Sequence, residues 1–102
     1  MAKYAFVGGI LVDGTGAAPV QDSLVLVDDD KITYAGPRTE VPAGYEVEDC
    51  TGKTVMPGLI DTHLHFSGNL TDDDNDWVIE SVAQKQACAV KQSYDCLTHG
   101  LT

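Results

Sequence analysis

The pattern of apolar residues changes character at Pro57-Gly58, and this change limits the folds open to the chain. Before it, short β-branched or aromatic runs alternate with Gly, Pro and Asp turns, as in strands. These runs are residues 4–12, 23–29, 31–36 and 45–55. We therefore predict a small antiparallel sheet for residues 1–56 and a different architecture for residues 57–102.

The second part reads as a strand, a polar loop and a helix. The apolar run 59–66 predicts the strand, and the helical pattern extends from Asp76 to Leu97. One apolar stripe recurs at spacings of three and four, through Ile79, Ala83, Ala87, Val90, Tyr94 and Leu97. Asn75 or Asp76 can cap the helix start, and Gly100 can end it. Together these elements are three quarters of a βαβ unit.

The sharpest turn is expected at Asp29-Asp30, which lies between two apolar runs. Aspartate tolerates the positive backbone angles that a short hairpin requires. "GTGAAP", residues 14–19, lacks the third glycine of a dinucleotide-binding loop, so it is interpreted as a turn between strands. "DDDND", residues 72–76, lacks the Gly and Glu of a calcium loop, so it is interpreted as a solvated helix start.

Charge and cysteine content exclude several classes of partner and compartment. With 16 acidic and 6 basic residues the chain carries a net charge of −10, which argues against nucleic acid and anionic membranes as partners. The first residues lack a signal-peptide pattern and no window approaches a spanning helix, so a cytoplasmic location is expected. Cys50, Cys88 and Cys96 form no CxxC pair, and we expect reduced, buried or half-buried thiols.

Asp61, His63 and His65 are the candidate site. Alternate residues of a strand share a face, so these three would lie opposite the apolar Ile60, Leu64 and Phe66. Same-face residues lie about 6.6 Å apart, which lets two imidazoles lean toward one ion. Two histidines alone would leave that ion short of ligands. The pair can also occur by chance, and Asp61 can simply be a hydrogen-bonding residue at a strand end.

The third histidine, His99, has a different expected role. It lies at the end of the predicted helix, where an imidazolium is favoured by the helix dipole. We interpret it as a cap or surface residue.

"VMPGLIDTHLHF" closely resembles the first-barrel-strand signature of the metal-dependent amidohydrolase superfamily, PGxxDxHxH. Residues 8–36 are similar to the N-terminal segment of that family, and residues 86–102 look like its first barrel helix leading to a second strand. The likeness is to the N-terminal portion of the family, nearest to its imidazolonepropionase-like and Xaa-Pro dipeptidase-like branch. The fold it implies is α/β, with strands of a flanking small β-sandwich in 1–56 and the first strand and first helix of a (β/α)8 TIM barrel in 57–102.

The resemblance also implies the chemistry. His63 and His65 would help bind one or two divalent ions, with Zn²⁺ expected, and Asp61 would orient a bound histidine or anchor the strand end. Water activated by the metal would cleave an amide, urea, carbamate, lactam or ester bond of a small-molecule substrate. The remaining ligands and the catalytic aspartate of the family correspond to positions beyond Thr102, and Lys53, Lys85 and Lys91 lie on the wrong elements to replace the bridging lysine.

No catalytic residue is therefore assigned within the chain, which is expected to be inactive alone and to pair with the remainder of the barrel or with another copy of itself as a homo-oligomer. The alternative is a non-catalytic β-rich structural or binding module that assembles with another chain.

Overall fold

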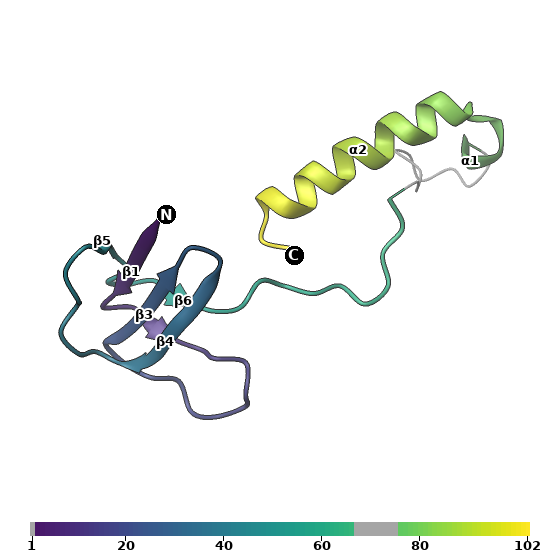
Figure 1. Ribbon diagram of the computed structural model, residues 1–102. Coiled ribbons are helices and arrows are strands. Elements are labelled where there is room, and N and C mark those ends of the chain that lie inside the picture. The colour runs from purple at the N-terminus through teal and green to yellow at the C-terminus, as the bar shows by residue number, and fades with distance from the viewer. Residues whose placement is uncertain (1, 67–75) are drawn as a thin grey trace. The chain divides into compact units, whose positions relative to one another are not determined.

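The protein is described by a computed structural model that covers residues 2–66 and 76–102 (Figure 1). The chain divides into two compact units, Met1–Pro57 and Gly58–Thr102. The first is built of strands and the second contains the helices. Every helix within the described ranges falls short of the length and apolar character needed to cross a lipid bilayer.

A four-stranded sheet forms most of the first unit. Its strand order is β4-β3-β1-β5, where β1 is Lys3–Val7, β3 is Ser23–Asp28, β4 is Lys31–Pro37 and β5 is Glu46–Asp49. A two-stranded sheet pairs β2 (Ile10–Leu11) with β6 (Thr54–Val55), and Leu11 also bridges Val20.

The expectation of an antiparallel sheet is only partly right. The β1–β3 and β3–β4 pairs are antiparallel, but β1 pairs with β5 and β2 pairs with β6 in parallel. After β4 the chain returns through residues 38–45 and joins the free edge of β1, so β5 runs in the same direction as β1. A purely antiparallel sheet was therefore the wrong prediction, because the long connection allows a crossover that short turns do not.

The predicted hairpin turn at Asp29-Asp30 is confirmed. Asp28 and Lys31 are cross-strand partners, and Asp29 has φ of 59°, in the left-handed region that aspartate tolerates. Residues 14–16 form bends and residues 17–19 are irregular, so this stretch connects β2 to Val20 as a loop.

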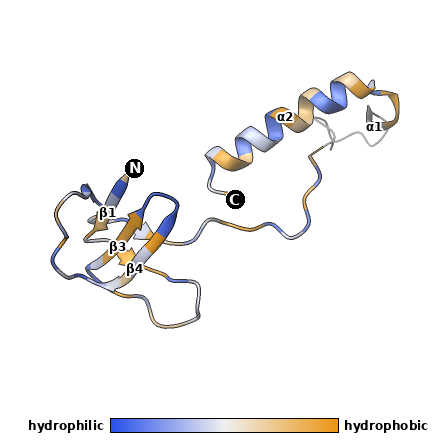
Figure 2. Ribbon diagram, in the orientation of Figure 1, coloured by the Kyte–Doolittle hydropathy of each residue, from blue (hydrophilic) through white to orange (hydrophobic). Residues whose placement is uncertain are grey.

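The core of the first unit lies between β1 and β3. Ala5, Val7, Leu24 and Leu26 are buried, and Tyr34, Val41 and Tyr45 pack against them. Figure 2 colours β3 as a hydrophobic strand. Ser23 is fully buried, and its hydroxyl donates to the Gly9 carbonyl at 2.8 Å, which satisfies the one polar side chain of this core among the described residues.

In the second unit, residues 59–66 do not form the predicted strand. The segment makes one parallel bridge, between Leu59 and Leu101, and residues 60–66 are irregular. A strand persists only where neighbouring strands satisfy its backbone groups. Within the part of the chain that the structure describes, Leu101 supplies that pairing for Leu59 alone.

The predicted single helix is two helices. α1 is Asp76–Ile79 and α2 is Val82–Thr98. Ser81, with extended backbone angles, separates them and caps α2: its hydroxyl accepts from the Gln84 amide while the Gln84 side chain accepts from the Ser81 amide. The strong local cap therefore overrides the continuous apolar spacing. The predicted charge cluster at the helix start lies outside the described residues over 72–75, which include the candidate cap Asn75.

Gly100 ends the helix as predicted. It has φ of 94°, and the chain closes in a Schellman motif in which Gly100 donates to Leu97 and Leu101 donates to Cys96. This turn also brings Leu101 to its bridge with Leu59.

The predicted apolar stripe of α2 is exposed: Val90, Tyr94 and Leu97 are 72%, 68% and 66% accessible. The buried residue of the helix is Cys88, on a different face, and Cys96 on that face is half-buried. All three cysteines are free thiols, and Cys50 is buried, which confirms the cysteine prediction.

Leu24→Ala is expected to destabilise the first unit by about 2–5 kcal/mol, because it opens a cavity at a fully buried position. Urea unfolding followed by the amide signals of β1 and β3 measures the loss. Ile32→Ala on β4, where the side chain is 68% exposed, is the matched control and should cost at most about 0.5 kcal/mol. Equal losses in the two variants would contradict this core.

Hydrogen bonds from the Thr51 hydroxyl and backbone lower the pKa of Asp49. Such a group stabilises the fold above its ordinary pKa of about 3.9, and that stability is lost as the pH falls through the lowered folded value. Thr51→Val should raise the pKa of Asp49 and reduce the acid dependence of stability. NMR titration checks this, with Thr15→Val as the control that alters the equivalent Asp13 turn instead. An unchanged Asp49 titration in Thr51→Val would refute it.

Candidate metal centre

The side chains of His63 and His65 contact each other. We call residues 58–66, which contain them, the HxH segment. His63 Nε2 and His65 Nε2 are 2.8 Å apart, and the ring centroids are 4.9 Å apart with a 33° tilt. Both residues are exposed. Their convergence matches the expectation that alternate residues present their side chains together, although the strand itself is absent.

The third residue of the site, Asp61, acts on the backbone. Its Oδ1 accepts a hydrogen bond from the His63 amide at 3.0 Å, closing an Asx turn. This contact acts on the backbone and not on an imidazole ring, and the two expected roles, orienting a bound histidine or anchoring the strand end, stay predictions. The Asx turn fixes the backbone at the first histidine.

Gln92, a residue that the sequence reasoning missed, contacts the backbone at the second histidine, His65. The side-chain amide of Gln92 on α2 faces the carbonyl oxygens of Phe66 and His65, and with its nitrogen toward them it donates at 2.6 Å and 3.3 Å. The opposite orientation would set an oxygen against two acceptors. No sequence motif points to this glutamine, because the contact depends on how α2 lies against residues 65–66.

A cavity of about 480 Å³ adjoins the same segment within the second unit. It is lined by residues of the HxH segment, of the C-terminal half of α2 and of the chain that follows the helix, among them Asp61, Leu64, Phe66, Ser93, Cys96 and Leu101. Its lining is mostly apolar and includes one acidic residue, Asp61. The candidate site therefore has a hollow beside it in which part of another molecule or chain segment can lie.

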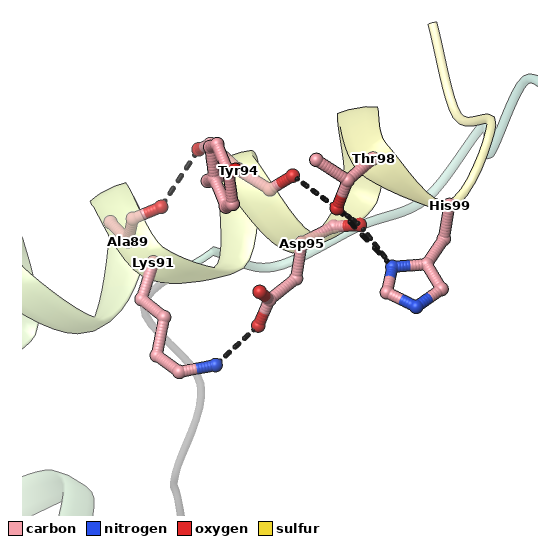
Figure 3. A network of polar contacts seen from close by, with 7 residues as sticks. Ala89, Lys91, Tyr94, Asp95, Thr98 and His99 are labelled. Carbon is pink, nitrogen blue, oxygen red and sulfur yellow. Dashed lines mark hydrogen bonds and ion pairs between the residues drawn. The ribbon is translucent and has the colours of Figure 1, made fainter.

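The third histidine lies apart from the pair in the hydrogen-bond network, as predicted. His99 caps α2, and its Nδ1 contacts the Asp95 carbonyl at 2.7 Å, so that nitrogen donates. Figure 3 shows this network, in which the Thr98 hydroxyl bonds back to the Tyr94 carbonyl and Lys91 pairs with the Asp95 carboxylate. His99 is a helix cap.

The paired imidazoles fit a divalent ion in part. Two nitrogens bound to a tetrahedral ion at about 2.0–2.1 Å lie roughly 3.3 Å apart, so to bind one the 2.8 Å pair would have to separate and both rings would have to turn their Nε2 lone pairs toward the ion. Without an ion, one ring must donate and the other accept across this contact. Residues 2–66 and 76–102 contain no cluster of three or more His, Cys, Asp or Glu side chains that could hold a metal. The pair thus offers two nitrogen ligands and leaves the other positions open.

Known proteins resemble this chain over much of its length. Imidazolonepropionase from Hyphomonas neptunium is 43% identical in a 67-residue alignment that covers 57% of this chain and 16% of that protein. The 5-methylthioadenosine/S-adenosylhomocysteine deaminase of Symbiobacterium thermophilum is 41% identical in a 73-residue alignment. That alignment covers 69% of this chain and 17% of that protein. The chain therefore spans about a sixth of the length of these curated relatives. No protein-family model matches it.

A solved structure of an amidohydrolase has a similar fold. The superposition covers 99% of this chain and 24% of the amidohydrolase chain. The TM-score is 0.80 and the sequence identity is 26%. The similarity thus extends to the three-dimensional structure and covers both units.

Asp61→Ala should speed hydrogen exchange at the His63 amide, because the Asx turn loses its acceptor. Asp61→Asn keeps an oxygen at the same position and should retain most of the protection. Amide exchange measured by NMR on both variants tests the role. His63 protection in Asp61→Ala equal to that of the unaltered protein would show that the turn does not depend on this side chain.

Proposed function

We propose that this chain, whose relatives support the amidohydrolase superfamily and its N-terminal part, carries the first two metal ligands of a metal-dependent hydrolase. The observation that supports this most strongly is the 2.8 Å approach of His63 Nε2 and His65 Nε2. Exposed imidazoles gain little from such proximity by themselves, whereas a divalent ion benefits from two adjacent nitrogen ligands.

The proposed role of this chain is to hold and orient. A divalent ion, Zn²⁺ being the expected one, supplies polarisation of the substrate carbonyl and lowers the pKa of water toward about 7 when bound. His63 and His65 bind through Nε2, which requires both rings to be neutral and to release the hydrogen bond between them. Asp61 holds the His63 backbone in place through its Asx turn.

In the architecture we propose, residues 1–56 supply strands of a small flanking β-sandwich, and residues 57–102 supply the first strand and first helix of a (β/α)8 barrel. The parallel bridge of Leu59 with Leu101, joined across α2, supports the second assignment because it is the start of a βαβ connection. The HxH pair would then lie toward the carboxyl end of the first strand, where barrels carry their chemistry.

The reaction we propose for the whole protein is hydrolysis of a carbon–nitrogen bond of the amide, urea, carbamate or lactam type, or of a related ester. The substrate would be a small molecule, and the protein would act in the cytoplasm. The relatives named imidazolonepropionase and deaminase support this reaction class. Two nitrogen donors do not complete a catalytic zinc site, which takes three protein ligands and water. The remaining ligands and the catalytic base would come from the rest of the parent protein, and the isolated chain would be inactive.

A non-catalytic binding module is the competing function. The exposed stripe of Val90, Tyr94 and Leu97 favours it, since such a surface commonly packs against another segment or chain. In that case the histidine pair would have no effect on the activity of the parent protein.

Replacing both histidines, His63→Ala with His65→Ala, in the full-length protein should abolish stoichiometric metal binding and hydrolysis. Metal content by mass spectrometry and hydrolase activity are the measurements. His99→Ala is the control and should retain both, because His99 caps a helix. Full metal content and activity in the double variant would rule out the proposal.

A further inference from the structure

We propose that Gln92 is a positioning residue for the paired histidines, tying the backbone at His65 to α2. The tie itself is a property of the chain, and its effect on metal affinity rests on the proposed function. Gln92 is half-buried and near the middle of α2, with its amide nitrogen 2.6 Å from the Phe66 oxygen and 3.3 Å from the His65 oxygen. A primary amide has two N–H groups, so one side chain can serve both carbonyls.

Burial does not hold the HxH segment in place. Every residue from Gly58 to Phe66 is exposed, and the segment lacks regular pairing beyond Leu59. Its conformation therefore depends on individual hydrogen bonds to a greater degree than a buried strand would.

Among the residues that the structure describes, two side-chain contacts restrain the segment, and they act on opposite ends of the histidine pair. Asp61 accepts from the amide of His63, and Gln92 donates to the carbonyl of His65. The first contact is local and restricts one turn of backbone. The second joins the segment to a different element, so it restricts where His65 stands relative to α2.

α2 is a suitable anchor for this contact. It runs for 17 residues, is closed by a capping box at Ser81 and ends in a Schellman motif at Gly100. Gln92 lies one turn from buried Cys88 and one turn from half-buried Cys96, so it stands on the helix face that is packed. A donor on a rigid, packed helix face fixes the acceptor it binds.

The consequence for the site is pre-organisation. Partners that orient a metal ligand without touching the ion typically change metal affinity by about 10–100-fold when removed. Loss of the Gln92 donor should free the His65 backbone and weaken metal binding by a factor in that range, while both imidazoles remain present.

The test uses the full-length protein and three variants. Gln92→Met keeps the length of the side chain and its helix propensity but has no N–H donor, and Gln92→Asn keeps an amide that is one methylene too short. Gln86→Met is the matched control, because Gln86 is an exposed glutamine of the same helix. Each protein is assayed for the Zn²⁺ dissociation constant by chelator competition, for amide exchange in residues 61–66, and for thermal midpoint.

We expect both Gln92 variants to bind Zn²⁺ about 10–100-fold more weakly and to exchange faster in 61–66, with Gln86→Met unchanged and all thermal midpoints similar. A purely structural role would lower the thermal midpoint without a selective effect on the metal constant. Unaltered Zn²⁺ affinity and exchange in the Gln92 variants would overturn the inference.

The same assays on the His63→Ala, His65→Ala protein separate the two proposals. If the double histidine variant loses Zn²⁺ binding while the Gln92 variants keep the unaltered Zn²⁺ affinity and exchange rates, the proposed function holds and the positioning role of Gln92 is refuted. If the double histidine variant retains Zn²⁺ binding, the proposed function is refuted. The amide exchange rates of residues 61–66 in the Gln92 variants then test only whether Gln92 restrains the His65 backbone.

Discussion

The parallel bridge between Leu59 and Leu101 is the constraint on which the arrangement of the second unit depends. Leu59 donates to the Gly100 carbonyl at 2.7 Å, and Thr102 donates back to the Leu59 carbonyl at 2.9 Å. The two segments approach so closely that a Cβ at Gly58 would come within 2.5 Å of Thr102 Cγ2. This contact joins the residue that introduces the HxH segment to the turn that ends α2, and so closes the loop on which the histidines lie.

Beyond that bridge, the candidate site is held by hydrogen bonds and not by packing. An exposed hydrogen bond contributes about 0.5–1.5 kcal/mol, so the Asx turn of Asp61 and the amide of Gln92 can bias the histidine pair but cannot make it rigid. Metal binding generally supplies ordering free energy to such sites. The pairing of His63 with His65 is therefore best regarded as a partly organised chelate that an ion would complete.

Local signals in the sequence predicted local structure well. Asp29-Asp30 marked the hairpin, Gly100 marked the helix end, and the HxH spacing indicated two converging imidazoles; each depends on backbone angles or side-chain alternation within a few residues. The parallel pairings of β5 and β6 were missed because they join segments far apart in the chain. The strand at 59–66 was over-predicted because an apolar, alternating run forms a strand only beside partner strands.

Two side chains show what the sequence reasoning missed in the second unit and why. Ser81 is unremarkable among polar residues, yet with Gln84 it forms the capping box that divides the predicted helix. Gln92 is one of several glutamines in that helix, and its contact with the His65 carbonyl follows from tertiary packing alone. The Gln92 contact requires knowledge of which face of the helix meets which segment, whereas the Ser81–Gln84 box is a local Ser-x-x-Gln pattern that the sequence itself carries.

Anomalous diffraction from crystals of the metal-loaded full-length protein, collected at the absorption edge of the bound ion, tests the central claim most directly. We expect an anomalous peak about 2.0–2.1 Å from Nε2 of both His63 and His65. A bound ion whose ligands include neither imidazole, with the two rings still hydrogen-bonded to each other, would contradict it.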